Sequence, residues 1–127
     1  MFPPVFQKLK DSTAVMALVS KDAKVRIYRH GRAPQPSSDA IPSEPYITWQ
    51  IVVGVPENNL SDPPPMDRQT VQIDMYHQTD KGIVDLAIAV RNAIEPYAHM
   101  TGQPVDEQER ETNLFHIAQE FDWFVPR

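Results

Sequence analysis

Four histidines are the side chains of this sequence best suited to act as a general acid, a general base or a metal ligand: His30, His77, His99 and His116. No two of them have the spacing of a His-x-x-x-His or His-Glu-x-x-His motif, and the chain has no cysteine to supply a thiolate. His116 could share one face of a strand with Glu120 or Asp122. That grouping supports one remote alternative, a small α+β enzyme using His116 and nearby carboxylates, although it fits a solvated strand face equally well.

The remaining carboxylates and serines give no second catalytic candidate. Residues 106–111 are a charged run without apolar neighbours, and raised carboxyl pKa values need burial or crowding, so this run predicts a solvated turn. Asp74 is either a lone polar group on an exposed strand face or a contact in an oligomer. The serines lie in no Gly-x-Ser-x-Gly motif, and four glycines form no phosphate-binding loop. We therefore expect no enzyme activity, no cofactor and no metal.

Length and charge narrow the class of protein. The 127 residues fit a single domain, residues 1–127, and the formal net charge of −5 argues against binding to a phosphate backbone. The absence of cysteine excludes disulfides. No secretory signal and no apolar window of about 18–20 residues is apparent, so we expect no membrane association and synthesis in a cytoplasm.

Thirteen prolines concentrate at the start of the chain and in two long loops, residues 33–45 and 54–68. In the rest of the chain, apolar periodicity predicts the helices and strands that must position any site. The prediction comprises one helix and strand before the loops, two alternating strands around the second loop, a helix with Thr79 as N-cap, and a last segment for which aromatic residues favour a strand over a helix: residues 5–19, 25–28, 46–53, 69–76, 79–95 and 114–124. Together they predict an α+β fold with a curved, mostly antiparallel β-sheet, two helices packed on it and long proline-rich loops.

Three segments, in this order, resemble the tail completion (tail terminator, or minor tail) family of long-tailed bacteriophages. They are Ala14-Val15-Met16-Ala17-Leu18-Val19 with Val25-Arg26-Ile27-Tyr28 and Ala33-Pro34; Glu44-Pro45-Tyr46-Ile47-Thr48-Trp49-Gln50; and Arg68-Gln69-Thr70-Val71-Gln72-Ile73-Asp74-Met75-Tyr76 followed by Ala87, Val90, Arg91, Ala93 and Ile94. The chain departs from the family in its long 54–68 loop and in Glu95-Pro96-Tyr97, which replaces small residues.

The resemblance implies a structural virion protein at the head-proximal end of the tail. Such a subunit would form a homo-hexameric ring that caps the tail tube, ends tube polymerisation and joins the tail to the head–tail connector protein. Its partners would be copies of itself, the tail tube protein and the connector, with DNA only passing through the lumen. A head–tail connector adaptor or stopper, another layer of the same machine, is the alternative.

The residues suggest where such contacts could form. A ring needs head-to-tail contacts, and long loops stiffened by proline lose less entropy on docking. We expect Glu57, Leu60, Asp67 and Arg68 of the 54–68 loop to contact a neighbour. Arg26 and Arg29 belong to a weak basic group that could meet an acidic partner, or could simply protect a strand edge from aggregation. Most of the aromatic residues Trp49, Phe121, Trp123 and Phe124 should be core, with one or two at an interface.

Overall fold

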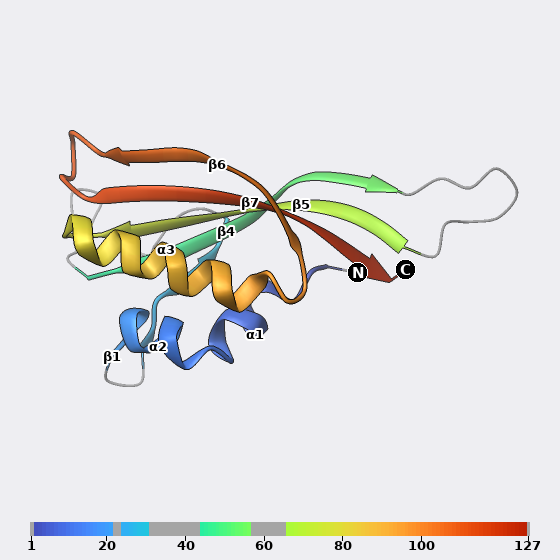
Figure 1. Cartoon of the computed structure of the whole chain (residues 1–127), viewed down its shortest axis with the longest axis horizontal. Helices are drawn as coiled ribbons and strands as arrows, with labels where there is room; N and C mark the ends of the chain where they lie inside the picture. The colour runs from blue at the N-terminus through green and yellow to red at the C-terminus, as the bar shows by residue number, and fades with distance from the viewer. Residues whose placement is uncertain (1, 22–23, 31–43, 57–65, 127) are drawn as a thin grey trace, which may run out of the picture.

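A computed structural model of the chain describes residues 2–21, 24–30, 44–56 and 66–126. Within these ranges, three helices and seven strands follow one another along the chain: α1 (Val5–Lys10), α2 (Thr13–Val19), β1 (Ser20–Lys21), β2 (Lys24–Val25), β3 (Ile27–Arg29), β4 (Tyr46–Pro56), β5 (Met66–His77), α3 (Asp80–Ile94), β6 (His99–Gln108) and β7 (Phe115–Pro126). All three helices lie on the same side of the main sheet (Figure 1).

The main sheet has five strands in the order β3-β4-β5-β7-β6. Only β3 and β4 pair in parallel, and the other three pairs are antiparallel. Since β5 and β6 are both antiparallel to β7, α3 connects two parallel strands with β7 between them. The predicted α+β fold with a mostly antiparallel sheet is confirmed.

The N-terminal segment is two short helices, so the predicted single helix over residues 5–19 is wrong. Ser12 has an extended backbone and its hydroxyl accepts a hydrogen bond from the Val15 amide at 3.3 Å, which starts α2 afresh. In a continuous helix Leu9 and Val15 would point about 120° apart, because each residue turns the helix by about 100°. The break lets both side chains reach the core, where each is fully buried.

The two alternating strands form the predicted hairpin but are longer than expected. β4 continues to Pro56 and β5 begins at Met66, so Asp67 and Arg68 belong to a strand and not to the loop. On β5 the alternation places Val71, Ile73 and Met75 on the helix-covered face, where all three are fully buried.

Helix α3 covers this face as its periodicity predicts. The Thr79 hydroxyl accepts a hydrogen bond from the Gly82 amide at 3.0 Å, which confirms the predicted N-cap. The apolar side chains of α3 pack into one core with those of α1, α2, β5 and β7; the α3 members are Ile83, Leu86, Ala87, Ala89, Val90 and Ile94.

The C-terminal segment confirms the preference for a strand, and β6 is an element that the sequence analysis missed. Of the run read as a turn, residues 106–108 lie in β6 and only the later residues form the turn. β6 is an edge strand, mostly exposed, with register shifts on both sides of Gly102. Because neither face is buried along its length, its sequence carries no apolar alternation.

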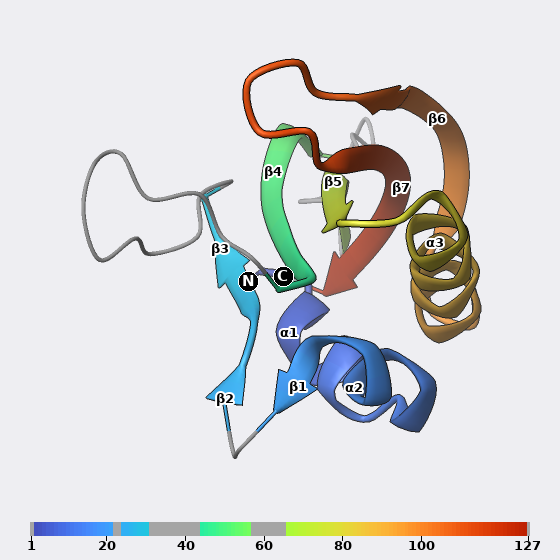
Figure 2. The same ribbon diagram turned by 90° about the vertical axis from the view of Figure 1, so that its left-hand side faces the viewer.

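The sheet is strongly curved. Viewed along the strands, the turn between β6 and β7 arches toward β4 on the side away from the helices (Figure 2).

Candidate functional site

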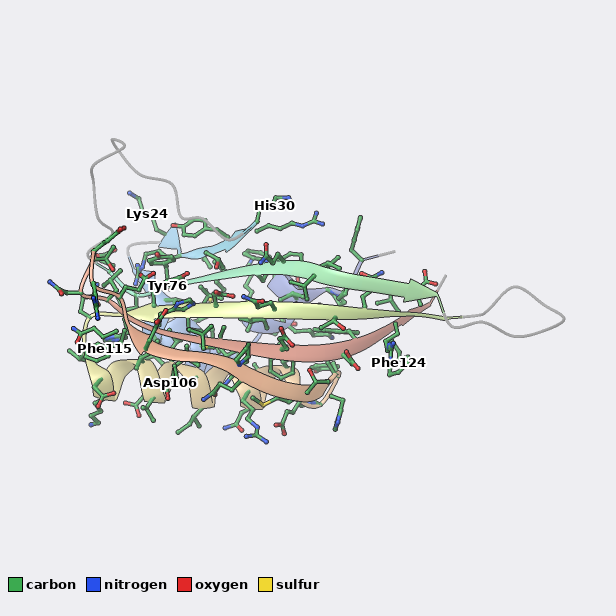
Figure 3. The ribbon with its side chains drawn as sticks, turned by 90° about the horizontal axis from the view of Figure 1, so that it is seen from above. Lys24, His30, Tyr76, Asp106, Phe115 and Phe124 are labelled. Atoms are coloured by element: carbon green, nitrogen blue, oxygen red, sulfur yellow. The ribbon has the colours of Figure 1, made fainter. Side chains whose placement is uncertain are left out.

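The helix-free face of the sheet gathers the polar side chains of its central strands. On β5 this face carries Thr70, Gln72, Asp74 and Tyr76, which alternate with the core residues. The β7 residues directly opposite them are Asp122, Glu120, Ala118 and His116. Figure 3 shows this face, with Tyr76 near one end of the sheet and Phe124 at the other.

Aromatic rings from successive strands stack across the Tyr76 end of this face. The ring of Tyr76 stacks on Tyr46 of β4 at a centroid distance of 4.5 Å and on the imidazole of His116 at 4.4 Å. Tyr28 of β3 extends the row at 6.5 Å from Tyr46. The three stacked residues are direct cross-strand neighbours, so strand register alone brings them together.

His116 is paired with a carboxylate of the neighbouring strand β5. Its Nε2 lies 2.8 Å from Oδ2 of Asp74 on the neighbouring strand, and its Nδ1 lies 4.0 Å from Oε1 of Glu107 on β6. Asp122 instead accepts a hydrogen bond from the Thr70 hydroxyl at 2.8 Å. His116, Glu120 and Asp122 do share the helix-free face of β7, but the carboxylate that contacts His116 is Asp74, which cross-strand register brings beside it.

The environment of this pair suits structural support rather than proton transfer. His116 is 8% exposed, with one ring face covered by Tyr76 and its Nε2 occupied by Asp74. Burial, with smaller contributions from neighbouring carboxylates, raises the pKa of Tyr46 to about 12 and raises that of Tyr76 further. Both phenols therefore stay protonated at neutral pH. Among the described residues, no group of three or more His, Asp or Glu side chains is placed to hold a metal ion.

Of the residues predicted to form an interface, Arg26 makes intramolecular contacts. Its Nε donates a hydrogen bond to the Pro45 carbonyl at 2.6 Å, and its Nη1 lies 3.2 Å from Oε2 of Glu44. Only 13% of its side chain is exposed. Arg26 thus fixes the start of β4 beside β3.

Arg29 is exposed and lies against two aromatic rings. Its guanidinium carbon is 4.8 Å from the ring centre of Phe2 and 5.1 Å from that of Trp49. This cation–π contact ties the N-terminal residues to the edge of the sheet.

Two of the four residues predicted from the 54–68 loop lie in the described strand β5. Glu57 and Leu60 lie outside the described residues. Asp67 and Arg68 pair with Val125 and Phe124 of β7 at the far end of the sheet, which is the end opposite the stacked rings of Tyr76 and His116. Arg29 pairs with Trp49 and Arg68 with Val55, six residues along β4 or about 20 Å. Arg29 and Arg68 therefore do not belong to one patch.

An apolar groove at the far end of the sheet was not predicted from the sequence. It has a volume of about 340 Å³ and is lined by residues from the N-terminal segment, the turn after α3 and the end of β7: Phe2, Pro4, Lys8, Tyr97, Trp123, Phe124 and Val125. Trp123 and Val125 are buried, whereas Phe2, Tyr97 and Phe124 are 62%, 51% and 48% exposed. One feature of the sequence could have indicated this groove. Phe124 falls out of phase with the buried alternation of Phe121, Trp123 and Val125, so a large aromatic side chain is left outside the core.

This chain matches one known protein family and has the fold of a solved virion protein. The family model described as "Tail completion protein gp17" matches residues 3–126. A chain of the solved structure described as the virion of a native gene transfer agent (GTA) particle has a similar fold, with a TM-score of 0.65 and 13% sequence identity. The match covers 97% of this chain and 92% of the other. Comparison with curated protein sequences gives no match.

Proposed function

This chain belongs to the tail completion protein gp17 family, and from that premise we propose that it forms a hexameric ring that caps the tail tube. The ring ends tube polymerisation and joins the tail to the head–tail connector. The observation that carries this proposal is the family match over residues 3–126, nearly the whole chain.

Membership of this family establishes the general role of the chain. The chain is a structural protein of the virion tail and not an enzyme. No helix within the described ranges is long and apolar enough to cross a membrane.

The distribution of exposed apolar side chains supports assembly into a ring. A ring needs two different surfaces on each subunit that are complementary to each other. One candidate is the groove at the far end of the sheet. Another is the outer side of α3, where Val84 and Ile88, four residues apart, are 45% and 55% exposed.

The proposed partners are further copies of the chain, the tail tube protein and the connector protein. DNA passes through the ring without sequence-specific contacts. The formal net charge of −5 suits this role, because acidic side chains repel the phosphate backbone and let DNA slide.

Native mass spectrometry over a range of concentrations, together with electron microscopy of tails, tests this proposal. Six copies in a closed ring, located at the head-proximal end of the tube, are expected. A chain that stays monomeric at every concentration, alone and with tail tubes, contradicts the ring. A ring located within the connector instead of on the tube identifies an adaptor or stopper.

A further inference from the structure

The groove at the far end of the sheet has the composition of a site that binds proline-rich segments. Such segments dock on grooves lined by exposed aromatic rings, because the rigid pyrrolidine rings pack flat against them with little loss of entropy. Here Phe2, Tyr97 and Phe124 are exposed around a buried floor of Trp123 and Val125.

The groove lies where the sheet leaves part of β7 uncovered. β6 begins at His99, which pairs with Asp122, so β7 from Trp123 onward has no β6 partner. Tyr97 and the N-terminal segment flank this uncovered stretch. An extended chain can therefore lie along the groove without displacing any described strand.

The groove is also bordered by positive charge. The ammonium of Lys8 lies 4.0 Å from the ring centre of Tyr97, and the guanidinium carbon of Arg29 lies 4.8 Å from that of Phe2. A matching occupant would combine prolines with carboxylates.

Two segments of this chain, residues 33–45 and 57–65, combine prolines with carboxylates, but only the second has consecutive prolines and directly precedes Met66, which pairs with Pro126 beside the groove. Residues 57–65 read Glu-Asn-Asn-Leu-Ser-Asp-Pro-Pro-Pro, with two carboxylates and no Lys or Arg. We propose that Asp62-Pro63-Pro64-Pro65 of one copy docks in the aromatic groove of a neighbouring copy, with Asp62 facing Lys8. This inference rests on the proposed ring only in requiring a second copy of the chain.

The prolines favour a neighbouring groove over the groove of the same chain. They directly precede Met66, which pairs with Pro126 at the end of β7, just beyond the groove floor. Three consecutive prolines favour an extended segment of about 3.1 Å per residue, which resists reversal. Reaching back into the groove of its own chain would require such a reversal.

Cysteine cross-linking tests the contact directly, because the chain has no cysteine of its own. Full-length protein carrying Pro64→Cys is mixed with protein carrying Tyr97→Cys and treated with a short bismaleimide. The expected product is a covalent dimer of the two variants. The matched control replaces Tyr97→Cys with Ala14→Cys, an exposed position on α2 outside the groove, and should give no mixed dimer.

A charge exchange supplies a second measurement. Lys8→Glu should lower the yield of mixed dimer about tenfold, and Asp62→Lys in the partner should restore it. Urea unfolding of each variant checks that the fold is intact.

The possible outcomes separate this contact from the ring itself. Six-copy rings without the mixed dimer overturn the docking and leave the ring standing. A mixed dimer in a protein that never closes into six copies supports the docking and overturns the ring. A chain carrying both cysteines that yields only internally linked monomer shows that the segment occupies its own groove, which also overturns the docking.

Discussion

Replacing Arg26 with alanine is expected to destabilise the folded chain by about 2–3 kcal/mol. The guanidinium donates to the Pro45 carbonyl at 2.6 Å, and a hydrogen bond involving a charged group contributes about 1.5–3 kcal/mol. The Glu44 carboxylate, 3.2 Å away, belongs to a side chain that is 47% exposed, so this ion pair adds only about 0.5 kcal/mol. Most of the lost stability therefore comes from the hydrogen bond to the Pro45 carbonyl.

Matched variants divide this loss between its two sources. Glu44→Ala should cost about 0.5 kcal/mol or less. Arg26→Lys should cost an intermediate amount of about 1–1.5 kcal/mol, since one ammonium cannot reproduce the two-sided contact of the guanidinium. Arg29→Ala removes an exposed cation from the rings of Phe2 and Trp49 and should cost about 0.5–1 kcal/mol.

Urea unfolding followed by tryptophan fluorescence measures these differences. Trp49 and Trp123 are 8% and 4% exposed, so unfolding moves both indoles into water. For a domain of this size, the Arg26→Ala midpoint should fall by about 1–2 M urea with an unchanged slope.

The sequence alone suggested a different role for Arg26, as a contact with an acidic partner. If the free energy of unfolding of Arg26→Ala lies within about 0.5 kcal/mol of that of the unaltered protein, and the variant nevertheless fails to assemble, the side chain acts at an interface. That result would refute the reasoning from the Pro45 and Glu44 contacts.

Three further changes test other parts of the structure. Gly82→Ala should destabilise by about 1 kcal/mol, because its Cβ would clash with the imidazole ring of His77. In a His77→Ala background, urea unfolding should show no such loss. Gln119→Met should change stability by less than about 1 kcal/mol in the same assay, because removing a buried Oε1 without a partner among the described residues is offset by the loss of the hydrogen bonds that Nε2 donates to the Ala87 carbonyl at 3.2 Å and to Oε1 of Gln103 at 3.3 Å. Burial is the main cause that raises the pKa of Tyr46 from 10.0 to about 12. The stability that the protonated phenol contributes should therefore be complete below pH 10 and should fall between pH 10 and 12. Tyr46→Phe should make this fall smaller in unfolding curves recorded at alkaline pH.

Features with a strong local signal could be read from the sequence. The Thr79 cap, the apolar spacing from Ile83 to Ile94 and the alternation along β5 each bury one side of a regular element. Since the periods of 3.6 and 2 residues follow from backbone geometry, neighbouring residues are sufficient to predict these elements.

Contacts between distant segments had no such signal. Asp74 and His116 are 42 residues apart and meet only because β5 and β7 pair in one register. β6 was missed because an edge strand buries little, and α1 was joined to α2 because the capping role of Ser12 depends on its extended backbone.

The sequence by itself determined the α+β class and, through resemblance, the tail completion family. Only the tertiary structure decided which exposed side chains share a surface. Phe2, Tyr97 and Phe124 come from three separate segments, and they line one groove because β6 begins too late to cover the end of β7. The physical reason is that local sequence fixes the period of an element, whereas packing and register fix what lies beside it.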